Sequence, residues 1–329
     1  MFIEPFKSFI FVRYFKNMNV YYSLEELPAF RDTVITIGSY DGVHVAHEKI
    51  LNKIIETASE KSLESVVITF HPHPRLIVQP KENGIKLLST RTEKIALFDK
   101  YQLNALVFVP FTIDFSQLSA EEYILNFLVR YFRPKFIIIG YDHRFGKDRS
   151  GDINLLRHFA PRAGFEVIEI EKQVVDDISI SSTKIRKALS LKDMQTAEKL
   201  LGHPYSIIGK VVKGRQLGRE LGYPTANVQT DEKEKLIPPA GIYSVWVFVS
   251  GLKYGGMLYI GDRPTVEELG VQSIEVNIFS FSEDIYGKSI KLDIVDFIRD
   301  DQKFESLSEL KQALAKDKII ALKQLNFTA

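Results

Sequence analysis

The pattern of hydrophobic and polar positions changes character once along the chain, at about Gly202. Before that point, five short apolar runs alternate with helical patterns, and they lie at 33–38, 65–70, 105–109, 135–140 and 165–170. Several runs are continuously apolar, as is typical of parallel strands covered on both faces. One helical stripe spans 50–58, and another spans 123–131 after a Ser119–Glu122 capping box. The pattern predicts a doubly wound α/β domain.

After Gly202 the apolar segments alternate or run on, separated by Gly, Pro and charged turns. They lie at 205–213, 241–249, 253–261, 273–281 and 289–297. This spacing predicts an antiparallel β-barrel or sandwich. Ser306 and Glu309 form a capping box for a closing helix whose one side carries Leu307, Leu310 and Leu314. We therefore predict an N-terminal extension over 1–18, an α/β domain over 19–201 and a β domain over 202–329.

Composition narrows the possible functions. With 43 basic and 42 acidic residues the net charge is +1, so bulk charge does not indicate a nucleic-acid or membrane partner. No apolar run is long enough to span a bilayer. The apolar N-terminus is interrupted by Lys7 and Arg13 and lacks a small-residue cleavage site, so we expect no signal peptide. Met18 is a natural start, and residues 1–17 are expected to be a dispensable tail or a misassigned upstream start.

The chain contains no cysteine. Disulfides, thiolate metal sites and cysteine nucleophiles are therefore excluded together. This composition fits a reducing cytosol, and we expect a cytoplasmic protein. The sequence does not determine an oligomeric state.

The string GSYDGVHVAH provides the first candidate site. A strand ends at Gly38, a turn carries Asp41 and Gly42, and a helix begins directly after His44. Free N–H groups and the positive end of the dipole make such a helix start suitable for phosphate. His44 and His47 are three residues apart, so both can face one ligand and donate to an α-phosphate. The alternatives are that the histidines cap a turn or bind a metal, and the absence of an HExxH pattern disfavours the metal.

Two further segments of the same domain suit phosphate. In ISISSTKIRKAL, Ser181 or Ser182 can cap a helix, and Arg186 lies one turn further along. The segment GYDHRFGKDRSGD follows a strand and carries Asp142 among glycines and basic residues. Each segment alone also fits an ordinary capped helix or a solvated loop. All three follow strands of one sheet, where ligands of such sheets bind, and together they favour a nucleotide site.

A second candidate site lies in the string GKVVKGRQLGRELGYPTAN. Gly209, Gly214 and Gly218 punctuate a basic segment that could wrap phosphates, although no Walker A motif occurs. Thr225 and Asn227 are two residues apart, so in an extended chain their side chains face one side. Their oxygens could hold Mg²⁺ together with ATP phosphates. A turn-rich hairpin loop is the plainer interpretation of the glycines alone.

The string SIEVNIFSF carries a carboxylate on the polar face of a strand. Ile274, Val276 and Ile278 share one face, while Glu275 and Asn277 share the other. A carboxylate on the open face of a barrel could accept a proton from a substrate hydroxyl. By itself the pattern favours an exposed strand glutamate.

Taken together, the strings resemble the bifunctional riboflavin kinase/FMN adenylyltransferase family over residues 19 to about 320. The matching strings are ITIGSYDGVHVAH, TFHPHPR, LSAEEYI, GYDHRFGKDRSGD, ISSTKIR, LLGHPYSIIGKVV, LGYPTAN, IGDRPT, IEVNIFSF and IRDDQKF. The resemblance implies a nucleotidyltransferase domain followed by a six-stranded barrel. It implies ATP-dependent phosphorylation of riboflavin to FMN with release of ADP, and adenylylation of FMN to FAD with release of pyrophosphate. Riboflavin, FMN and ATP are the implied partners, and Mg²⁺ is the implied metal.

The resemblance also implies roles for individual residues. His44 and His47 contact the ATP phosphates, Glu275 is the base that activates the ribityl hydroxyl, and Arg299 orders the flavin. Thr225 and Asn227 hold the Mg²⁺-nucleotide. The remaining nucleotide-binding positions are Gly38, Asp41, Gly42, Asp142, Ser182, Thr183, Arg186, Gly209, Gly214 and Gly218.

Four positions depart from the family pattern. Ala46 replaces a glycine, Ser39 an asparagine, Asp301 a glutamate and Ser280 an aspartate. None of them removes a residue assigned to chemistry, although Ala46 could crowd the phosphate.

Other functions stay open at this point. Only one half could be active, or the first domain could adenylylate a pantetheine phosphate or a nicotinamide nucleotide. A flavin-sensing protein without turnover is a further alternative. The complete barrel disfavours a different acceptor, and the intact histidines and Glu275 disfavour a sensor.

Overall fold

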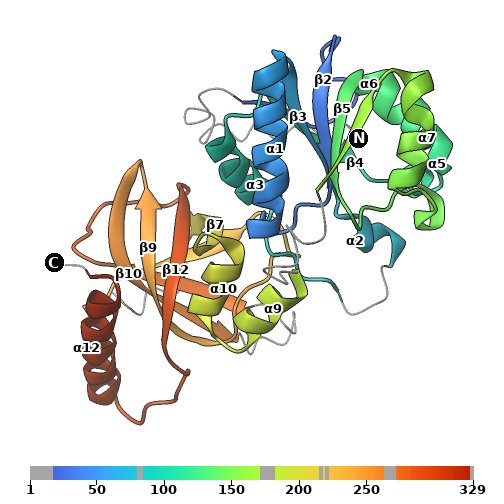
Figure 1. Ribbon diagram of the computed structural model, residues 1–329. Helices are drawn as coiled ribbons and strands as arrows, with labels where there is room; N and C mark the ends of the chain where they lie inside the picture. Colours follow the sequence, from blue (N-terminus) through green and yellow to red (C-terminus); the bar gives the residue numbers. More distant parts are fainter. Residues whose placement is uncertain are drawn as a thin grey trace, which may run out of the picture. The chain divides into compact units, whose positions relative to one another are not determined.

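The computed structural model describes residues 18–79, 84–170, 182–214, 218, 222–262 and 272–326. The described residues fall into two compact units, 18–170 and 182–326 (Figure 1). The helices α9 (Ser182–Ser190) and α10 (Met194–Leu201) group with the second unit. The domain boundary predicted after residue 201 stays a prediction. Of the extension predicted over 1–18, residues 1–17 lie outside the described residues, whereas Met18 is buried in the core of the first unit.

The first unit contains a six-stranded sheet in the order β1-β4-β3-β2-β5-β6, and every neighbouring pair is parallel. The strands are β1 (Asn19–Tyr21), β2 (Thr33–Ile37), β3 (Glu64–His71), β4 (Ala105–Pro110), β5 (Pro134–Gly140) and β6 (Glu166–Ile170). The five predicted strands are confirmed. The three-residue β1 was not predicted, because so short a segment has too few positions to show a period.

Helices cover both faces of this sheet (Figure 1). They are α1 (Val45–Lys61), α2 (Pro74–Val78), α3 (Arg91–Phe98), η1 (Asp99–Tyr101), α4 (Ile113–Ser116), α5 (Ala120–Glu122), the π-helix η2 (Tyr123–Val129), α6 (Arg130–Phe132), η3 (Lys147–Arg149) and α7 (Ile153–Ala163). Successive strand residues point to opposite faces: Val34 packs with α1 and α3, whereas Ile35 packs with η2 and α7. Burial on both faces explains the continuous apolar runs.

The sheet order reverses at β2. From β2 the chain moves to β3 and β4 on one side, whereas β5 and β6 lie on the other side. In such sheets the ligand crevice lies outside the carboxyl ends of the strands at this switch point. The crevice is therefore flanked by the segments that follow Ile37 and Gly140.

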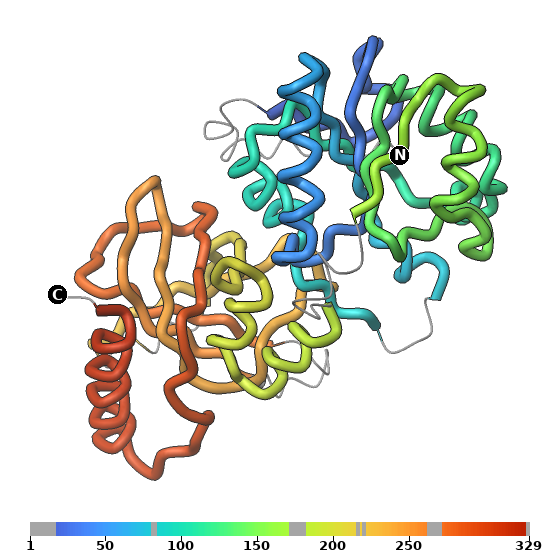
Figure 2. The backbone as a smooth tube through the Cα atoms, in the orientation of Figure 1, coloured from blue at the N-terminus to red at the C-terminus, as the bar shows by residue number. Residues whose placement is uncertain are grey.

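The second unit is built on a closed antiparallel barrel in the order β10-β11-β8-β7-β12-β9, traced in Figure 2. Its strands are β7 (Tyr205–Val212), β8 (Thr225–Thr230), β9 (Gly241–Val249), β10 (Leu252–Asp262), β11 (Gln272–Ile278) and β12 (Ser289–Arg299). The barrel prediction is confirmed, and the sixth strand, β8, lies in the segment that follows the glycine-rich string.

The helix α12 (Leu307–Gln324) ends the described chain and packs on β9, β10 and β12. The cap of Ser306 is confirmed, because its hydroxyl accepts from the Glu309 N–H at 3.2 Å. The predicted apolar stripe is wrong at Leu307, whose exposed fraction is 70%. The buried positions of the helix are Asp317 and Ala321, so a polar contact takes part in its docking.

Candidate active sites

The loop between β2 and α1 is held in a strained backbone conformation. Tyr40 has φ 46° and Val43 has φ 42°, values that cost a side-chain-bearing residue about 1–2 kcal/mol each. Tyr40 is buried, and its hydroxyl hydrogen-bonds to the Thr36 hydroxyl at 2.7 Å. A Cβ on Gly38 would lie 3.0 Å from the Tyr40 ring, so glycine permits this packing. Strain of this kind persists where the surroundings over-determine the conformation.

Asp41 and Gly42 tie this loop to the segment before α3. The Asp41 Oδ1 accepts from the N–H groups of Leu88 at 2.8 Å and Ser89 at 3.2 Å. The Gly42 N–H donates to the Ser89 hydroxyl at 2.9 Å, and its φ of 85° favours glycine. These contacts give both residues a role in shaping the loop. Their predicted contact with nucleotide stays a prediction.

His44 and His47 lie together at the start of α1. His44 occupies the N-cap position of α1, and its side chain forms no cap hydrogen bond to the helix. Its ring stacks on that of His47, with centroids 3.8 Å apart and planes 16° apart. The His47 Nδ1 is enclosed and has no hydrogen-bond partner among the described residues. Burial, then the charges of His44 and Lys94, hold the pKa of His47 well below its ordinary value of 6.5.

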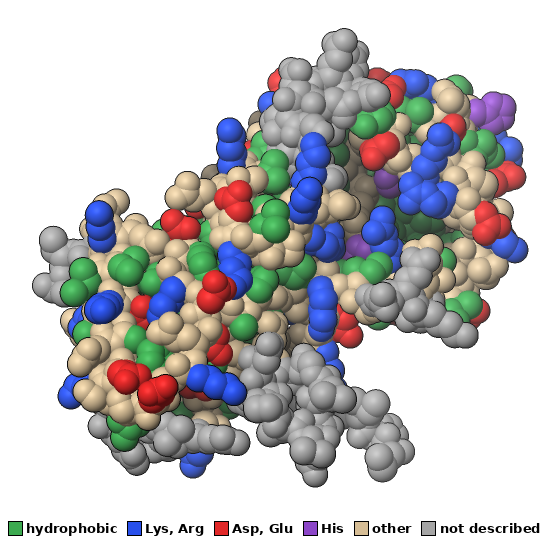
Figure 3. All heavy atoms as spheres, turned by 90° about the horizontal axis from the view of Figure 1, so that it is seen from below, with side chains coloured by type: hydrophobic (Ala, Val, Ile, Leu, Met, Phe, Trp, Pro, Cys, Tyr) green, Lys and Arg blue, Asp and Glu red, His purple; other side chains and the backbone are tan. Residues whose placement is uncertain are grey.

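Both imidazoles are thus brought to one place at the carboxyl end of β2. With its pKa lowered, His47 is neutral near pH 7, and a neutral imidazole can donate one hydrogen bond. Seen from below, this unit shows histidine side chains recessed among lysine and arginine side chains (Figure 3). In the described part of the chain no three His, Cys, Asp or Glu side chains are placed to hold a metal together.

Asp142 follows β5, the strand next to β2 on the other side of the switch point. The side chain of Asp142 is exposed, and the loop is closed by a bridge between Phe145 and Gly151. Its neighbour His143 is partly buried, and burial followed by the charge of Arg149 lowers the pKa of His143 to about 4. The predicted placement of Asp142 on the crevice agrees with this topology.

Ser182, Thr183 and Arg186 lie on α9, at the beginning of the second unit. Their predicted grouping with the histidines of the first unit stays a prediction, and Ser181 lies outside the described residues.

The barrel aligns Glu275 with two polar side chains on its outer face. In the strand register Glu275 lies directly opposite Tyr259 on β10 and Asn227 on β8. Directly opposite residues share a face, with Cβ atoms about 4.5–5.5 Å apart. The Thr225 hydroxyl donates to the Glu275 Oε2 at 3.3 Å. The structure therefore brings three sequence-predicted residues together: Thr225, Asn227 and Glu275.

Two of the predicted glycines approach this cluster closely. A Cβ on Gly214 would lie 2.2 Å from the Asn227 Nδ2, so only glycine lets the backbone pass there. A Cβ on Gly218 would lie 2.3 Å from the Tyr223 carbonyl oxygen and 3.3 Å from the Thr225 hydroxyl. Residues 215–217 and 219–221 lie outside the described residues. Gly214 and Gly218 therefore both lie against the predicted magnesium ligands.

Gly209 has a different surrounding. It lies within β7, where a Cβ would meet the Gln229 carbonyl oxygen at 2.5 Å. Barrel packing alone therefore requires glycine here, and its predicted nucleotide role stays a prediction.

Arg299 is bound to α12. Its guanidinium forms an ion pair with Asp317 at 2.9 Å and donates through Nη1 to the Asp300 carbonyl oxygen at 2.9 Å. The guanidinium also lies over the Phe304 ring, 5.6 Å from its centroid. These contacts link β12 to the C-terminal segment. A flavin contact of Arg299 stays a prediction.

Sequence reasoning missed two residues at these sites. Tyr259 donates to the Asp301 Oδ2 at 3.1 Å beside Glu275, and Lys94 donates to the Ser39 carbonyl oxygen at 2.7 Å in the histidine loop. Strand register could have indicated Tyr259 once the barrel was known. A lysine at a core-facing position of a helix was the available signal for Lys94.

Two of the four positions that depart from the family pattern, Ser280 and Ala46, lie at constrained places in the structure. Ser280 has φ 52°, a conformation in which aspartate is less strained than serine. Ala46 is buried in the first turn of α1, next to His47.

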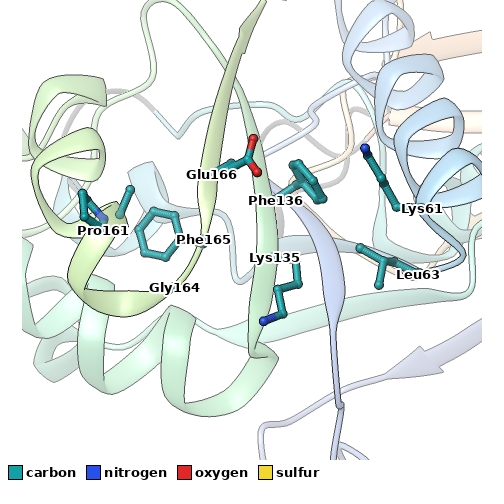
Figure 4. Close-up of a pocket in the computed structure, with 9 residues that line it drawn as sticks. Lys61, Leu63, Lys135, Phe136, Pro161, Gly164, Phe165 and Glu166 are labelled. Carbon is teal, nitrogen blue, oxygen red and sulfur yellow. The ribbon is translucent and has the colours of Figure 1, made fainter.

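One pocket of the first unit lies at the opposite, amino edge of the sheet. Figure 4 shows Pro161 and Phe165 on one side of it and Lys61 and Phe136 on the other. Lys135 and Glu166, at the beginnings of β5 and β6, complete its lining. Because ligands of parallel sheets bind at the carboxyl edge, this pocket is not the candidate active site. In the parts of the chain that the structure covers, no helix is long and apolar enough to cross a membrane.

Comparisons with known proteins identify a family for each of the two parts of the chain. The family model for FAD synthetase matches residues 27–184, and the model for riboflavin kinase matches residues 201–325. A bifunctional riboflavin kinase/FMN adenylyltransferase from Buchnera aphidicola subsp. Acyrthosiphon pisum is 36% identical over 297 residues, covering 90% of this chain and 94% of its own. The protein of the same name from Escherichia coli strain K12 is 36% identical over 289 residues, covering 88% and 91%.

A solved structure is also similar. The crystal structure described as a macrolide-efflux protein from Streptococcus pneumoniae matches with a TM-score of 0.82 and 29% identity, covering 92% of this chain and 98% of that one. The name of that structure differs from the names of the sequence relatives and of both family models, which agree on flavin enzymes. Both family models match in chain order, and a relative is 36% identical over 90% of this chain. The chain therefore belongs to the bifunctional riboflavin kinase/FMN adenylyltransferase family.

Proposed function

We propose that the cluster around Glu275 is the riboflavin kinase site and that the loop of His44 and His47 is the FMN adenylyltransferase site. As a member of its family the chain is a bifunctional enzyme with both activities. The observation that carries the assignment is the contact of Thr225 with Glu275, which stands directly opposite Asn227. Thr225 and Glu275 are 50 residues apart in the sequence. Strands β8 and β11 thus supply a carboxylate and two side chains with hard oxygens to one surface.

At the kinase site the nucleophile is a neutral primary alcohol. Glu275 accepts the proton of the ribityl hydroxyl as the oxygen bonds to the γ-phosphorus and ADP leaves. The hydroxyl of Thr225, within hydrogen-bonding distance, orients the carboxylate. Thr225 and Asn227 also fit Mg²⁺, because their side-chain oxygens are hard donors on one face, and Gly214 leaves room beside Asn227. When bound, the metal would supply positive charge to the ATP phosphates.

At the adenylyltransferase site no strong base is required. The FMN phosphate is already an anion, and it attacks the α-phosphorus of ATP as the bond to pyrophosphate breaks. The role of the protein is to orient the phosphates and to stabilise the negative charge that develops on them. The stacked imidazoles and the start of α1 provide donors at fixed positions. Gly38, Asp41 and Gly42 shape the loop that carries them.

The test is to incubate the pure protein with riboflavin and Mg-ATP and to separate the flavins with time. We expect FMN to form first and FAD to follow. Formation of FMN alone would show that only the barrel is active, and binding of riboflavin without turnover would show a sensor. Pantetheine phosphate and nicotinamide mononucleotide serve as competing acceptors in the same assay. The predicted cytoplasmic location is part of this proposal, and the absence of cysteine supports it.

A further inference from the structure

A buried lysine contacts the loop that carries the histidines, and it has no role in the mechanism given above. Lys94 is on α3, and its exposed fraction is 4%. Lysine is almost never buried to this extent unless its ammonium is bound. The Lys94 Nζ donates to the Ser39 carbonyl oxygen at 2.7 Å, and the Thr69 hydroxyl donates to the same oxygen at 3.2 Å. The first residue after Gly38 is thus fixed from two elements.

The position of this ammonium is significant for the histidines. Ser39 is the second residue after β2, the strand whose carboxyl end faces the crevice, and His44 is five residues further along. The charge of Lys94 also acts on His47, where it adds to burial in lowering the imidazole pKa. The ammonium and the two rings therefore share one electrostatic environment.

The segment before Lys94 is itself rigid. Thr90 and Glu93 form a reciprocal capping box at the start of α3. Leu88 and Ser89, immediately before it, hold Asp41 and Gly42. Residues 88–94 therefore form one segment that holds the strained loop, and Lys94 is the last residue of this segment.

We propose that Lys94 is a positioning residue for adenylyl transfer, which fixes the loop through Ser39 and places its positive charge near His47. This inference rests on the proposed adenylyltransferase site. ATP and the leaving pyrophosphate carry several negative charges, whereas the neutral imidazole of His47 brings a hydrogen bond but no net charge. A fixed cation in a water-poor site stabilises such charge more strongly than one in water.

The test compares Lys94→Gln with Lys94→Arg in the full chain. Gln removes the charge but keeps a side-chain donor, whereas Arg keeps the charge. The matched control is Lys49→Gln, which removes an exposed lysine from α1. The measurements are kcat and KM for FAD synthesis, the inhibition constant of inorganic pyrophosphate, and riboflavin phosphorylation by the same samples.

For Lys94→Gln we expect kcat of FAD synthesis to fall ~10²-fold, as for removal of one preorganised group. The inhibition constant of pyrophosphate should rise about tenfold, a change that loss of packing alone would not produce. Lys94→Arg should recover most of both values, and the control and riboflavin phosphorylation should stay unchanged. Wild-type pyrophosphate inhibition in Lys94→Gln would overturn the inference, as would Lys94→Arg behaving like Lys94→Gln while folded. If the wild-type protein makes no FAD from FMN, the proposed function itself fails.

Discussion

Arg299 at the end of β12 forms a bidentate ion pair with Asp317 of α12. Its Nε reaches the Oδ1 at 2.9 Å and its Nη2 reaches the Oδ2 at 2.9 Å. Asp317 is only 2% exposed, so its carboxylate is withdrawn from water and depends on this partner. The family resemblance assigns Arg299 to the flavin, whereas its observed contacts fasten the C-terminal helix to the barrel.

Asp317→Ala should therefore destabilise the second unit. Removing one partner of a buried pair typically costs about 3–5 kcal/mol, because the other charge is left unpaired. The single tryptophan, Trp246, packs with residues of α12, so its fluorescence during urea unfolding reports this unit. Lys316→Ala, at an exposed position of the same helix, is the control and should change little.

Arg299→Lys separates the two roles of this residue. Lys cannot reproduce the bidentate geometry, so the free energy of unfolding of the second unit should fall. The KM for riboflavin, measured on folded protein, should stay unchanged. A raised KM for riboflavin with unchanged stability would instead favour the flavin role.

Glu275→Gln should nearly stop riboflavin phosphorylation and leave FMN adenylylation intact. Gln has almost the same shape and keeps the strand paired, but it cannot accept the proton, a loss of ~10²–10⁴ in rate. Separate assays of the two steps on one sample measure this effect. A near wild-type kinase rate would identify Glu275 as an ordinary strand-surface residue.

Asn227→Ala should impair the kinase by a different route. It removes a side-chain oxygen that we assign to the Mg²⁺-nucleotide, so raised Mg²⁺ should partly restore the rate. Titration of Mg²⁺ in parallel with Glu275→Gln distinguishes the two residues. Equal rescue of both variants would mean that Glu275 acts through metal binding and that another group is the base.

His47→Ala should reduce FAD formation ~10²–10³-fold and spare FMN formation, because it removes one preorganised donor near the α-phosphate. His158→Ala, at an exposed position of α7, is the matched control. Rates of FMN and FAD formation are measured separately by chromatography. An equal fall in both rates would place the adenylyl-transfer site elsewhere.

His143 should make the stability of the first unit depend on pH. Its pKa is about 4 in the folded state, below the ordinary 6.5, so between these values the unfolded chain binds more protons. Stability is therefore complete above pH 6.5 and falls as pH drops towards 4, by up to ~3 kcal/mol at about 1.4 kcal/mol per pKa unit.

Calorimetric unfolding of the wild type and of His143→Phe at pH 7 and pH 5 measures this contribution. Phe cannot titrate, so the variant should lose less stability at pH 5 than the wild type does. His158→Gln should keep the wild-type difference, since its side chain is exposed. Identical pH dependence in all three proteins would contradict the assignment to His143.

The sequence by itself determined those features that depend on neighbours along the chain. Continuous apolar runs such as 135–140 are recognisable from neighbouring residues alone, because a strand that is buried on both faces is apolar at successive positions. His44 and His47 are one helical turn apart, so their pairing needed only the position of a helix start. The Ser119–Glu122 capping box is equally local, and it is confirmed.

Tertiary structure decided the contacts between distant segments. Glu275 meets Thr225 across 50 residues, Lys94 meets Ser39 across 55 residues, and Tyr259 meets Asp301 across 42 residues. The ion pair of Arg299 with Asp317 could not be predicted for the same reason, since strand register and helix docking have no counterpart in local periodicity. Such contacts form only after the barrel has closed and α3 has packed, because side chains remote in sequence acquire fixed distances only in the assembled core.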